Sequence, residues 1–244
     1  ISFRRGFLGL GKEQTLIYKG GQLFNPEGSL YQGKIKGFLR TTFNALNEIR
    51  TTESGRNMLE ELESSKNVFI IKHARYNPGR GNKKHYAQHE YEFIPSNYIK
   101  AFAIQYATDP SYYYSFQEYK KRGEIASGSG GTIYWNPDLP VYVSEQGEKV
   151  ANRPTVFLAH ELFHARDANR GLLDSREELK VPRSEWQAVY WENVLRQQMG
   201  LPLRTHYEVE AIYNPSIGRL TWKGRGPYML TLEGEPLLPS WYKP

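Results

Sequence analysis

Cysteine is absent from this chain of 244 residues. The missing thiols exclude a disulfide framework, a thiolate metal site, an iron–sulfur cluster and a cysteine nucleophile. Any metal bound here must therefore use nitrogen and oxygen ligands. Long apolar runs are also missing, because every such run in the sequence is far shorter than the ~20 residues that cross a bilayer. We expect no membrane span.

Internal repeats, low-complexity linkers and strong charge clusters are lacking as well. The 32 basic and 26 acidic residues give a net charge of +6, and the densest basic stretch runs only from Lys72 to Lys84. Binding to nucleic acid favours a more concentrated basic stripe with groups that read bases, so a nucleic-acid partner is disfavoured. Hydrophobic residues at 39% and charged residues at 24% are typical of a globular protein.

The length and the start of the chain set its expected organisation. No signal peptide is recognisable and the first residue is isoleucine, so we expect a sequence cut or processed from a longer protein. We predict one α+β domain over residues 1–244. It comprises an irregular N-terminal segment (1–30), an N-terminal lobe (31–150) and a part with the active-site helix followed by further helix (151–244).

Apolar spacing and turn residues predict the main elements. Steps of three and four residues predict amphipathic helices, and short β-branched or alternating runs predict strands of a mainly antiparallel sheet. The predicted helices span 33–50, 54–63, 154–169 and 184–196, and the predicted strands span 67–71, 101–106 and 132–135. Gly171 is a natural end for the third helix.

The third predicted helix contains the pattern His-Glu-Leu-Phe-His at residues 160–164. Histidines four residues apart on a helix point the same way and match two vertices of a Zn²⁺ tetrahedron. Glu161 is placed to act as general base on a zinc-bound water. The competing interpretation is a buried helix in which both histidines are structural. A second pair, His85 and His89, has the same spacing in a polar stretch, and we interpret it as surface.

A catalytic zinc needs a third protein ligand. The metzincin pattern would put a histidine shortly after His164, but the next histidine is His206. The gluzincin pattern takes a glutamate from the following helix, which favours Glu185 over the alternatives Glu192 and Asp174. Glu192 lies two turns after Glu185 and can orient a histidine from behind the ligands.

Residues that follow the fourth helix are candidates for stabilising the charge on the scissile carbonyl oxygen. Tyr207 and Arg204 are the favoured donors, and His206 is the reserve. The competing interpretation is a surface loop with an arginine–acid pair. Substrate binding is predicted at a sheet edge to which an extended peptide adds as a strand, formed by Thr132, Ile133, Tyr134 and Trp135.

Three blocks of the chain carry a family resemblance: His160–His164, Glu185–Arg196 (Glu-x-x-Ala-x-x-x-Glu-Asn-x-x-Arg) and Gly200–Tyr207. Together they resemble the NleD-like zinc endopeptidases, which include type III effectors and the C-terminal toxin tips of Rhs/YD-repeat proteins. Phe24–Tyr31 and Thr51–Arg56 are similar to segments that precede the protease core in the Rhs-linked members. The Arg-x-x-Tyr spacing that ends the third block also resembles the oxyanion pair of clostridial neurotoxin light chains.

The resemblance implies a zincin-like fold, a Zn²⁺ cofactor and an endopeptidase toxin that cleaves a protein inside a target cell. It further implies secretion or injection by a carrier or secretion apparatus, and we expect a monomer. Two other functions stay open: a catalytically dead protease fold that binds a host protein, and a toxin that acts on nucleic acid. Chelator-sensitive cleavage of a proteome separates the peptidase from both.

Overall fold

The computed structural model describes residues 1–4, 13–74, 92–109, 111, 117–118, 120–122, 128–138, 142–145 and 148–243. The fold combines helices with sheets, consistent with the predicted α+β class. The helices are α1 (Gly37–Arg50), α2 (Glu53–Ser64), α3 (Tyr98–Ala101), α4 (Ala103–Thr108), α6 (Pro154–Arg170) and α7 (Arg183–Gln198). The predicted pair His85 and His89 lies outside the described residues.

The larger sheet has five strands in the order β2-β1-β5-β7-β6. Its strands are β1 (Ser2–Arg4), β2 (Glu13–Thr15), β5 (Phe69–His73), β6 (Glu92–Pro95) and β7 (Gly131–Trp135). Its two inner pairings, β1 with β5 and β5 with β7, are parallel, and its outer pairings are antiparallel. The other described strand pairings are antiparallel, so parallel pairing is confined to the centre of this sheet.

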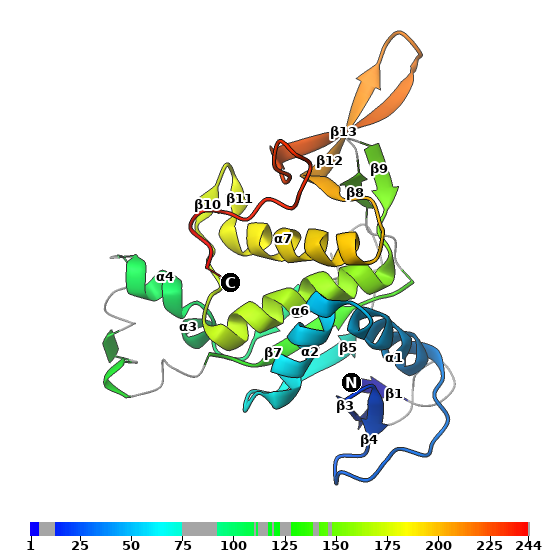
Figure 1. The fold of residues 1–244 in the computed structure, drawn as a ribbon, viewed down its shortest axis with the longest axis vertical. Coiled ribbons are helices and arrows are strands. Elements are labelled where there is room, and N and C mark those ends of the chain that lie inside the picture. Colours follow the sequence, from blue (N-terminus) through cyan, green and yellow to red (C-terminus); the bar gives the residue numbers. More distant parts are fainter. Residues whose placement is uncertain are drawn as a thin grey trace, which may run out of the picture.

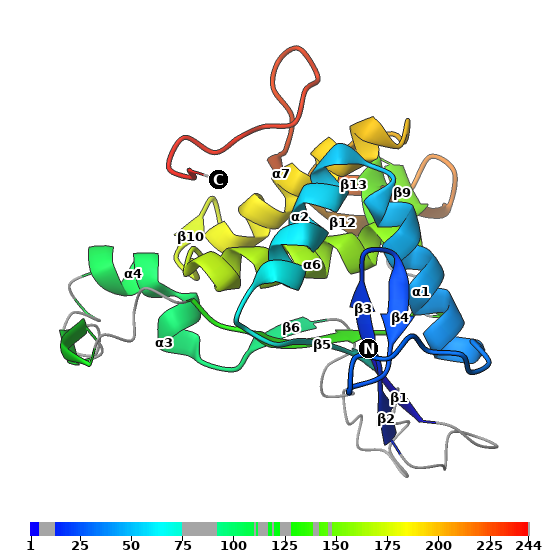
Figure 2. The same cartoon turned by 60° about the horizontal axis from the view of Figure 1, so that its bottom comes forward.

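Helix α6 lies at the centre of the fold, between this sheet and α7, with α1 and α2 beside it (Figure 2). Nearly every side chain from Thr155 to Ala168 is buried, because neighbours cover the helix on all sides. Leu158 and Phe163 are completely enclosed. The helix ends where Gly171 takes a left-handed conformation (φ 72°) and its N–H bonds to carbonyls of the last turn, as predicted.

A second sheet, in the order β13-β12-β8-β9, packs near the far end of α7. Its strands are β8 (Tyr142–Glu145), β9 (Glu148–Ala151), β12 (Arg204–Asn214) and β13 (Arg219–Tyr228). The outer parts of β12 and β13 form a two-stranded ribbon that projects from the body, at the top of Figure 1. Short hairpins complete the described strands: β3 (Ile17–Lys19) with β4 (Gln22–Phe24), and β10 (Glu177–Glu178) with β11 (Val181–Pro182).

One prediction about local structure is wrong. Residues 101–106 do not form the predicted strand: Ala101 ends α3, which Asn97 caps by accepting a hydrogen bond from the Lys100 N–H, and α4 begins after Phe102. The described part of the first 30 residues contains four short strands, and the β12–β13 ribbon follows α7, where the sequence predicts no helix or strand. None of the helices in the described part of the chain is both long and apolar enough to span a bilayer.

Candidate metal centre

Two imidazoles of α6 define the candidate site. His160 and His164 lie one helical turn apart and are 5% and 9% exposed. Their Nε2 atoms approach to 3.2 Å, so the free faces of both rings are directed at one point. The side chain of Phe157 stacks on the His160 ring, with 5° between the planes. Packing therefore holds this imidazole in place before any ligand binds.

Glu185, in the first turn of α7, brings a carboxylate to the same point. Its Oε2 lies 3.3 Å from His160 Nε2 and its Oε1 lies 3.3 Å from His164 Nε2. Ligand atoms of the three side chains all lie within 4.8 Å of one another. Burial works against the charge of Glu185, but the two histidines hold its pKa well below the usual value, so it stays ionised.

The alternative ligand Asp174 is engaged elsewhere. Its carboxylate binds Arg176, with Nε to Oδ1 at 2.8 Å, and lies 3.5 Å from Arg183 Nη1. Its backbone carbonyl accepts the N–H of Ser184. These contacts hold the β10–β11 hairpin and the start of α7, so Asp174 helps to position Glu185 and takes no place beside the histidines.

Glu192, two turns after Glu185 on α7, contacts the ring nitrogen of His160 that faces away from the shared point. It is completely buried, and its Oε2 lies 3.0 Å from His160 Nδ1. Burial alone would raise the pKa of Glu192, but the charges of Arg204 and Arg196 and the bond to His160 keep it well below its usual value. An ionised carboxylate only accepts hydrogen bonds, so Nδ1 of His160 carries a proton and Nε2 is the ring atom that faces the shared point.

The donor set fits a divalent ion such as Zn²⁺. Two imidazole nitrogens and the Glu185 carboxylate form the ligand set, and the Glu192 carboxylate binds the other ring nitrogen of His160. This is the usual environment of a catalytic zinc. Without a metal, burial opposes the charged form of His160, but Glu185 and Glu192 outweigh it and raise its pKa to about 10. A metal must therefore displace a proton from this histidine as it binds.

Glu161 stands beside this cluster and faces an opening. It lines a cavity of about 190 Å³ together with His164 and Glu185. The remaining walls come from β6, from α3 and the residue that follows it, from the segment after α6 and from the start of α7: Glu92, Phe93, Pro95, Tyr98, Phe102, Leu173 and Ser184. Burial raises the pKa of Glu161, and the two histidines and a hydrogen bond from the Phe93 backbone N–H oppose that shift. A carboxyl group in such surroundings can accept a proton and release it again.

The predicted oxyanion donors occupy different positions. Tyr207 is half-buried, and its hydroxyl makes a hydrogen bond with Glu185. Burial and the charge of Glu185 raise the pKa of Tyr207 far above its usual value, so the hydroxyl keeps its proton and remains a donor. The Arg204 guanidinium turns inward: Nη1 lies 3.0 Å from Glu192 Oε2, and Nε and Nη2 donate to the backbone carbonyls of His206 and Tyr207.

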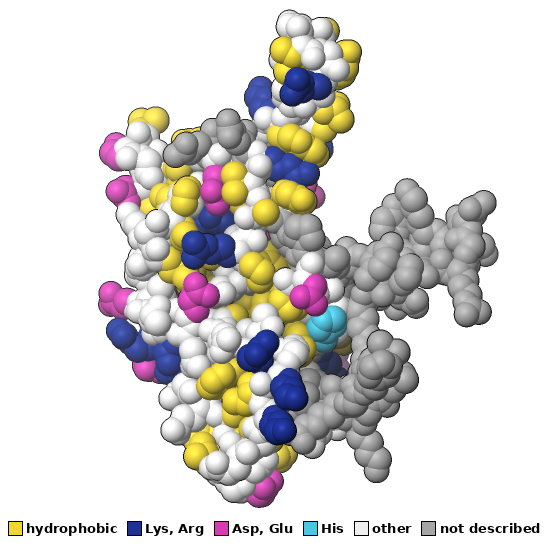
Figure 3. Space-filling model, turned by 90° about the vertical axis from the view of Figure 1, so that its right-hand side faces the viewer, with side chains coloured by type: hydrophobic (Ala, Val, Ile, Leu, Met, Phe, Trp, Pro, Cys, Tyr) yellow, Lys and Arg dark blue, Asp and Glu magenta, His cyan; other side chains and the backbone are white. Residues whose placement is uncertain are grey.

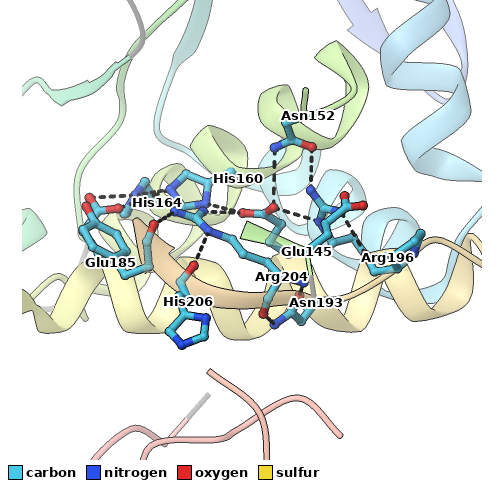
Figure 4. A network of polar contacts seen from close by, with 12 residues as sticks. Glu145, Asn152, His160, His164, Glu185, Asn193, Arg196, Arg204 and His206 are labelled. Atoms are coloured by element: carbon cyan, nitrogen blue, oxygen red, sulfur yellow. Dashed lines mark hydrogen bonds and ion pairs between the residues drawn. The ribbon is translucent and has the colours of Figure 1, made fainter. Parts of the chain in front are cut away.

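The imidazole of His206 points away from the cluster (Figure 4). Its Nδ1 lies 3.1 Å from Thr205 Oγ1 and 3.5 Å from Ser144 Oγ. Its ring packs edge-on against Tyr228 and covers Gly224, where a Cβ atom would clash with it. Among the described residues, the group that can hold a metal is His160, His164 and Glu185, without His206.

A buried polar layer between α6, α7 and the second sheet supports these groups (Figure 4). Arg196 donates to Glu192 (2.9 Å), to Glu145 of β8 (2.6 Å) and to Asn152 (2.7 Å). The side-chain amide of Asn193 accepts a hydrogen bond from the Arg204 backbone N–H at 2.8 Å and donates one to the Arg204 carbonyl at 2.9 Å. It thus makes the pair of hydrogen bonds that the backbone of a neighbouring strand would make. The sequence offers no signal for these roles, because they depend on β8 and β12 meeting α7.

The prediction of a substrate edge at residues 132–135 is wrong. Strand β7 is paired on both sides, in parallel with β5 and antiparallel to β6, so its backbone groups are already used. Among the described strands, β6 is the edge on this side of the sheet, and its residues line the opening beside Glu161. The strand nearest the site was missed because most of the residues before it are polar and carry no strand pattern.

Comparison with known proteins adds one finding. No curated protein and no solved structure matches the chain. The family model of the M91 peptidases, described as effector protein, matches residues 26–207, a range that contains the two histidines, Glu185 and Tyr207. The chain therefore belongs to peptidase family M91, a family of effector proteins.

Proposed function

We propose that this protein is a zinc-dependent endopeptidase effector with His160, His164 and Glu185 as metal ligands. The observation that carries the proposal is the convergence of ligand atoms of these three side chains within 4.8 Å, beside a further acidic group, Glu161, that lines an open cavity. A carboxylate left free next to a metal centre is what peptide hydrolysis requires and what a structural metal site lacks.

When bound, Zn²⁺ supplies a Lewis acid that polarises the scissile carbonyl and lowers the pKa of water. Glu161 takes the proton of the attacking water and returns it to the leaving amine nitrogen, since burial raises its pKa above the usual value and makes the carboxylate a better proton acceptor. Tyr207 donates its hydroxyl hydrogen to the developing oxyanion in exchange for its bond to Glu185.

Arg204 acts in this scheme as a positioning residue. Its contacts with Glu192 and with the carbonyls of His206 and Tyr207 hold the start of β12 against the site. Its guanidinium neutralises part of the negative charge around His160 and leaves the oxyanion to Tyr207. We further propose that residues 1–244 act as one zincin-like peptidase domain and that the substrate chain passes along β6.

The biological setting follows from the family. An effector peptidase acts on a protein of the cell that receives it, so we propose delivery into a target cell by a secretion apparatus or as the toxin tip of an Rhs-type carrier. The substrate is a protein, and the chain works as a monomer.

Two measurements test the proposal. Elemental analysis of purified protein is expected to find one zinc per chain. Mapping of new N-terminal peptides in cell lysates is expected to find cleavage by the wild type that chelation abolishes and that Glu161→Gln lowers about 10²- to 10⁴-fold with metal retained. Unchanged cleavage by the Glu161→Gln variant would falsify the mechanism.

A further inference from the structure

The outer part of the β12–β13 ribbon has two unlike faces. From Glu208 to Asn214 and from Arg219 to Arg225 the strands pair in regular register, so alternate residues share a face. One face carries large apolar side chains that are exposed to solvent: Tyr213 (63%), Leu220 (59%) and Trp222 (43%). Hydrophobic and basic side chains gather on this projection, at the top of Figure 3.

The opposite face is charged. Glu208 and Glu210 both lie near Arg225, with their carboxylates 3.6 and 3.9 Å from its Nε. Arg219 and Lys223 lie on the same face and form no ion pair with any residue that the structure describes. The ribbon therefore presents one apolar face, and its opposite face carries charged side chains of both signs around Ile212.

One aromatic residue of the apolar face is held in place. The ammonium group of Lys149, on β9, lies 3.5 Å from the centre of the Trp222 ring and 3.8 Å from that of Tyr142. Such a cation–π contact fixes the indole without covering its outer side. A rigid, exposed tryptophan costs little conformational entropy on binding, and tryptophan, tyrosine and arginine dominate the binding energy of protein interfaces.

The ribbon is continuous with the candidate active site. Near its start, strand β12 places Arg204 against Glu192 and Tyr207 beside Glu185, and it is anchored to α7 by the two hydrogen bonds of Asn193. Six residues further along the same strand, at ~3.3 Å each, lies Tyr213, about 20 Å from Tyr207. A polypeptide with its scissile bond at the metal centre can therefore reach this face with a segment more than about six residues away.

We propose that the apolar face of the β12–β13 ribbon docks the protein substrate at a segment remote from the scissile bond. The segment it fits has aromatic or aliphatic side chains that pack on Tyr213, Leu220 and Trp222. Arg219 and Lys223 lie on the opposite face of the ribbon and take no part in this contact. This inference rests on the proposed peptidase function. It adds that the peptidase selects its protein substrate by binding a segment remote from the scissile bond.

A polypeptide fits this surface better than a lipid bilayer does. A polypeptide that is cleaved at the metal centre already lies against the start of β12, the strand that carries this face, whereas a bilayer has no such second contact. An isolated ribbon is marginally stable in water, and exposed apolar patches of this kind mark interaction sites. A flat, one-sided apolar surface next to a peptidase centre matches a substrate that lies across both.

The test uses the protein that lysate mapping shows to be cleaved most efficiently, once purified, and a synthetic peptide of about twelve residues centred on its cleavage site. The ribbon variant combines Tyr213→Ser, Leu220→Ser and Trp222→Ser. Its matched control combines Leu30→Ser, Leu232→Ser and Leu238→Ser, which are exposed apolar residues elsewhere. The ribbon variant is expected to cut the whole protein about 10- to 100-fold less efficiently, through a higher KM, and the short peptide at the wild-type rate.

A charge-reversed variant of the opposite face, Arg219→Glu with Lys223→Glu, is expected to leave KM for the whole protein unchanged, because the segment docks on the apolar face. Wild-type cleavage of the whole protein by the ribbon variant would overturn the docking inference alone, and so would an equal loss on protein and short peptide. Binding of the wild type to phosphatidylserine vesicles that the ribbon variant loses would assign the face to lipid. Absence of any Glu161-dependent cleavage would remove the proposed function, and the docking inference with it.

Discussion

The polar layer beneath the metal centre and the β12–β13 ribbon are built on opposite principles. In the polar layer, Glu192 is fully enclosed and binds His160, Arg196 and Arg204. On the ribbon, side chains as large as Tyr213 and Leu220 face solvent. Charged side chains are buried in the polar layer, where they fix the metal ligands, and apolar side chains are exposed on the ribbon, where a binding partner can cover them.

Strand β12 belongs to both regions, so the stability cost of a substitution is expected to differ between its two ends. At its start, each polar group has several protein partners, and removing one leaves the others buried and unpaired, at a cost of ~1–3 kcal/mol or more. At its outer end, side chains have few neighbours and tolerate change, at ~0.5 kcal/mol or less. Matched substitutions of the same residue type in the two regions test this contrast.

The largest difference is expected between two histidines. His160→Ala should lose the bound zinc and reduce cleavage to background, because two of three ligands do not hold a catalytic metal. His206→Ala should keep one zinc per chain and lose less than about tenfold in kcat/KM, since its imidazole points away from the cluster (Figure 4). Elemental analysis with activity measurements checks both variants, and loss of metal in His206→Ala would make His206 a ligand after all.

The next difference concerns two glutamates. Glu192→Gln leaves Arg196 and Arg204 short of a buried counter-charge, so we expect a loss of ~3–5 kcal/mol in the free energy of unfolding and a 10- to 100-fold weaker affinity for zinc. Glu208→Gln alters an exposed pair with Arg225 at 3.6 Å and should cost less than ~1 kcal/mol. Urea unfolding in chelator measures both, and similar losses would contradict the contrast.

A smaller difference is expected between two asparagines. Asn193→Ala leaves the N–H and carbonyl of Arg204 unpaired in a buried site, which should cost ~1–3 kcal/mol of stability. Because the start of β12 then loosens, kcat should fall about tenfold with little change in KM. Asn214→Ala removes only an exposed turn contact with the Ser216 N–H and should cost ~0.5 kcal/mol or less. Thermal unfolding and peptide kinetics check the pair.

Sequence patterns predicted what depends on neighbours within a few turns. The helix that carries His160 and His164, its end at Gly171 and the helix that carries Glu185 all follow from apolar spacing and caps. The strand pattern at residues 101–106 was misleading, because Ala101 ends α3, which Asn97 caps and which packs against α6, and the residues after Phe102 form α4. The ribbon itself was missed, although the alternation around its turn at Asn214–Gly218 was a usable signal.

The sequence by itself determined the chemistry that is available: a chain without cysteine, with two imidazoles one turn apart and an acid between them, offers nitrogen and oxygen ligands to a metal. Only the tertiary structure decided that Glu185 reaches the histidines, that Arg204 turns toward Glu192, and that β6 borders the opening in place of β7. The physical reason is range. Helical periodicity acts over four residues, whereas the direction of Arg204 depends on a carboxylate that only the packing of β12 on α7 brings within 3.0 Å.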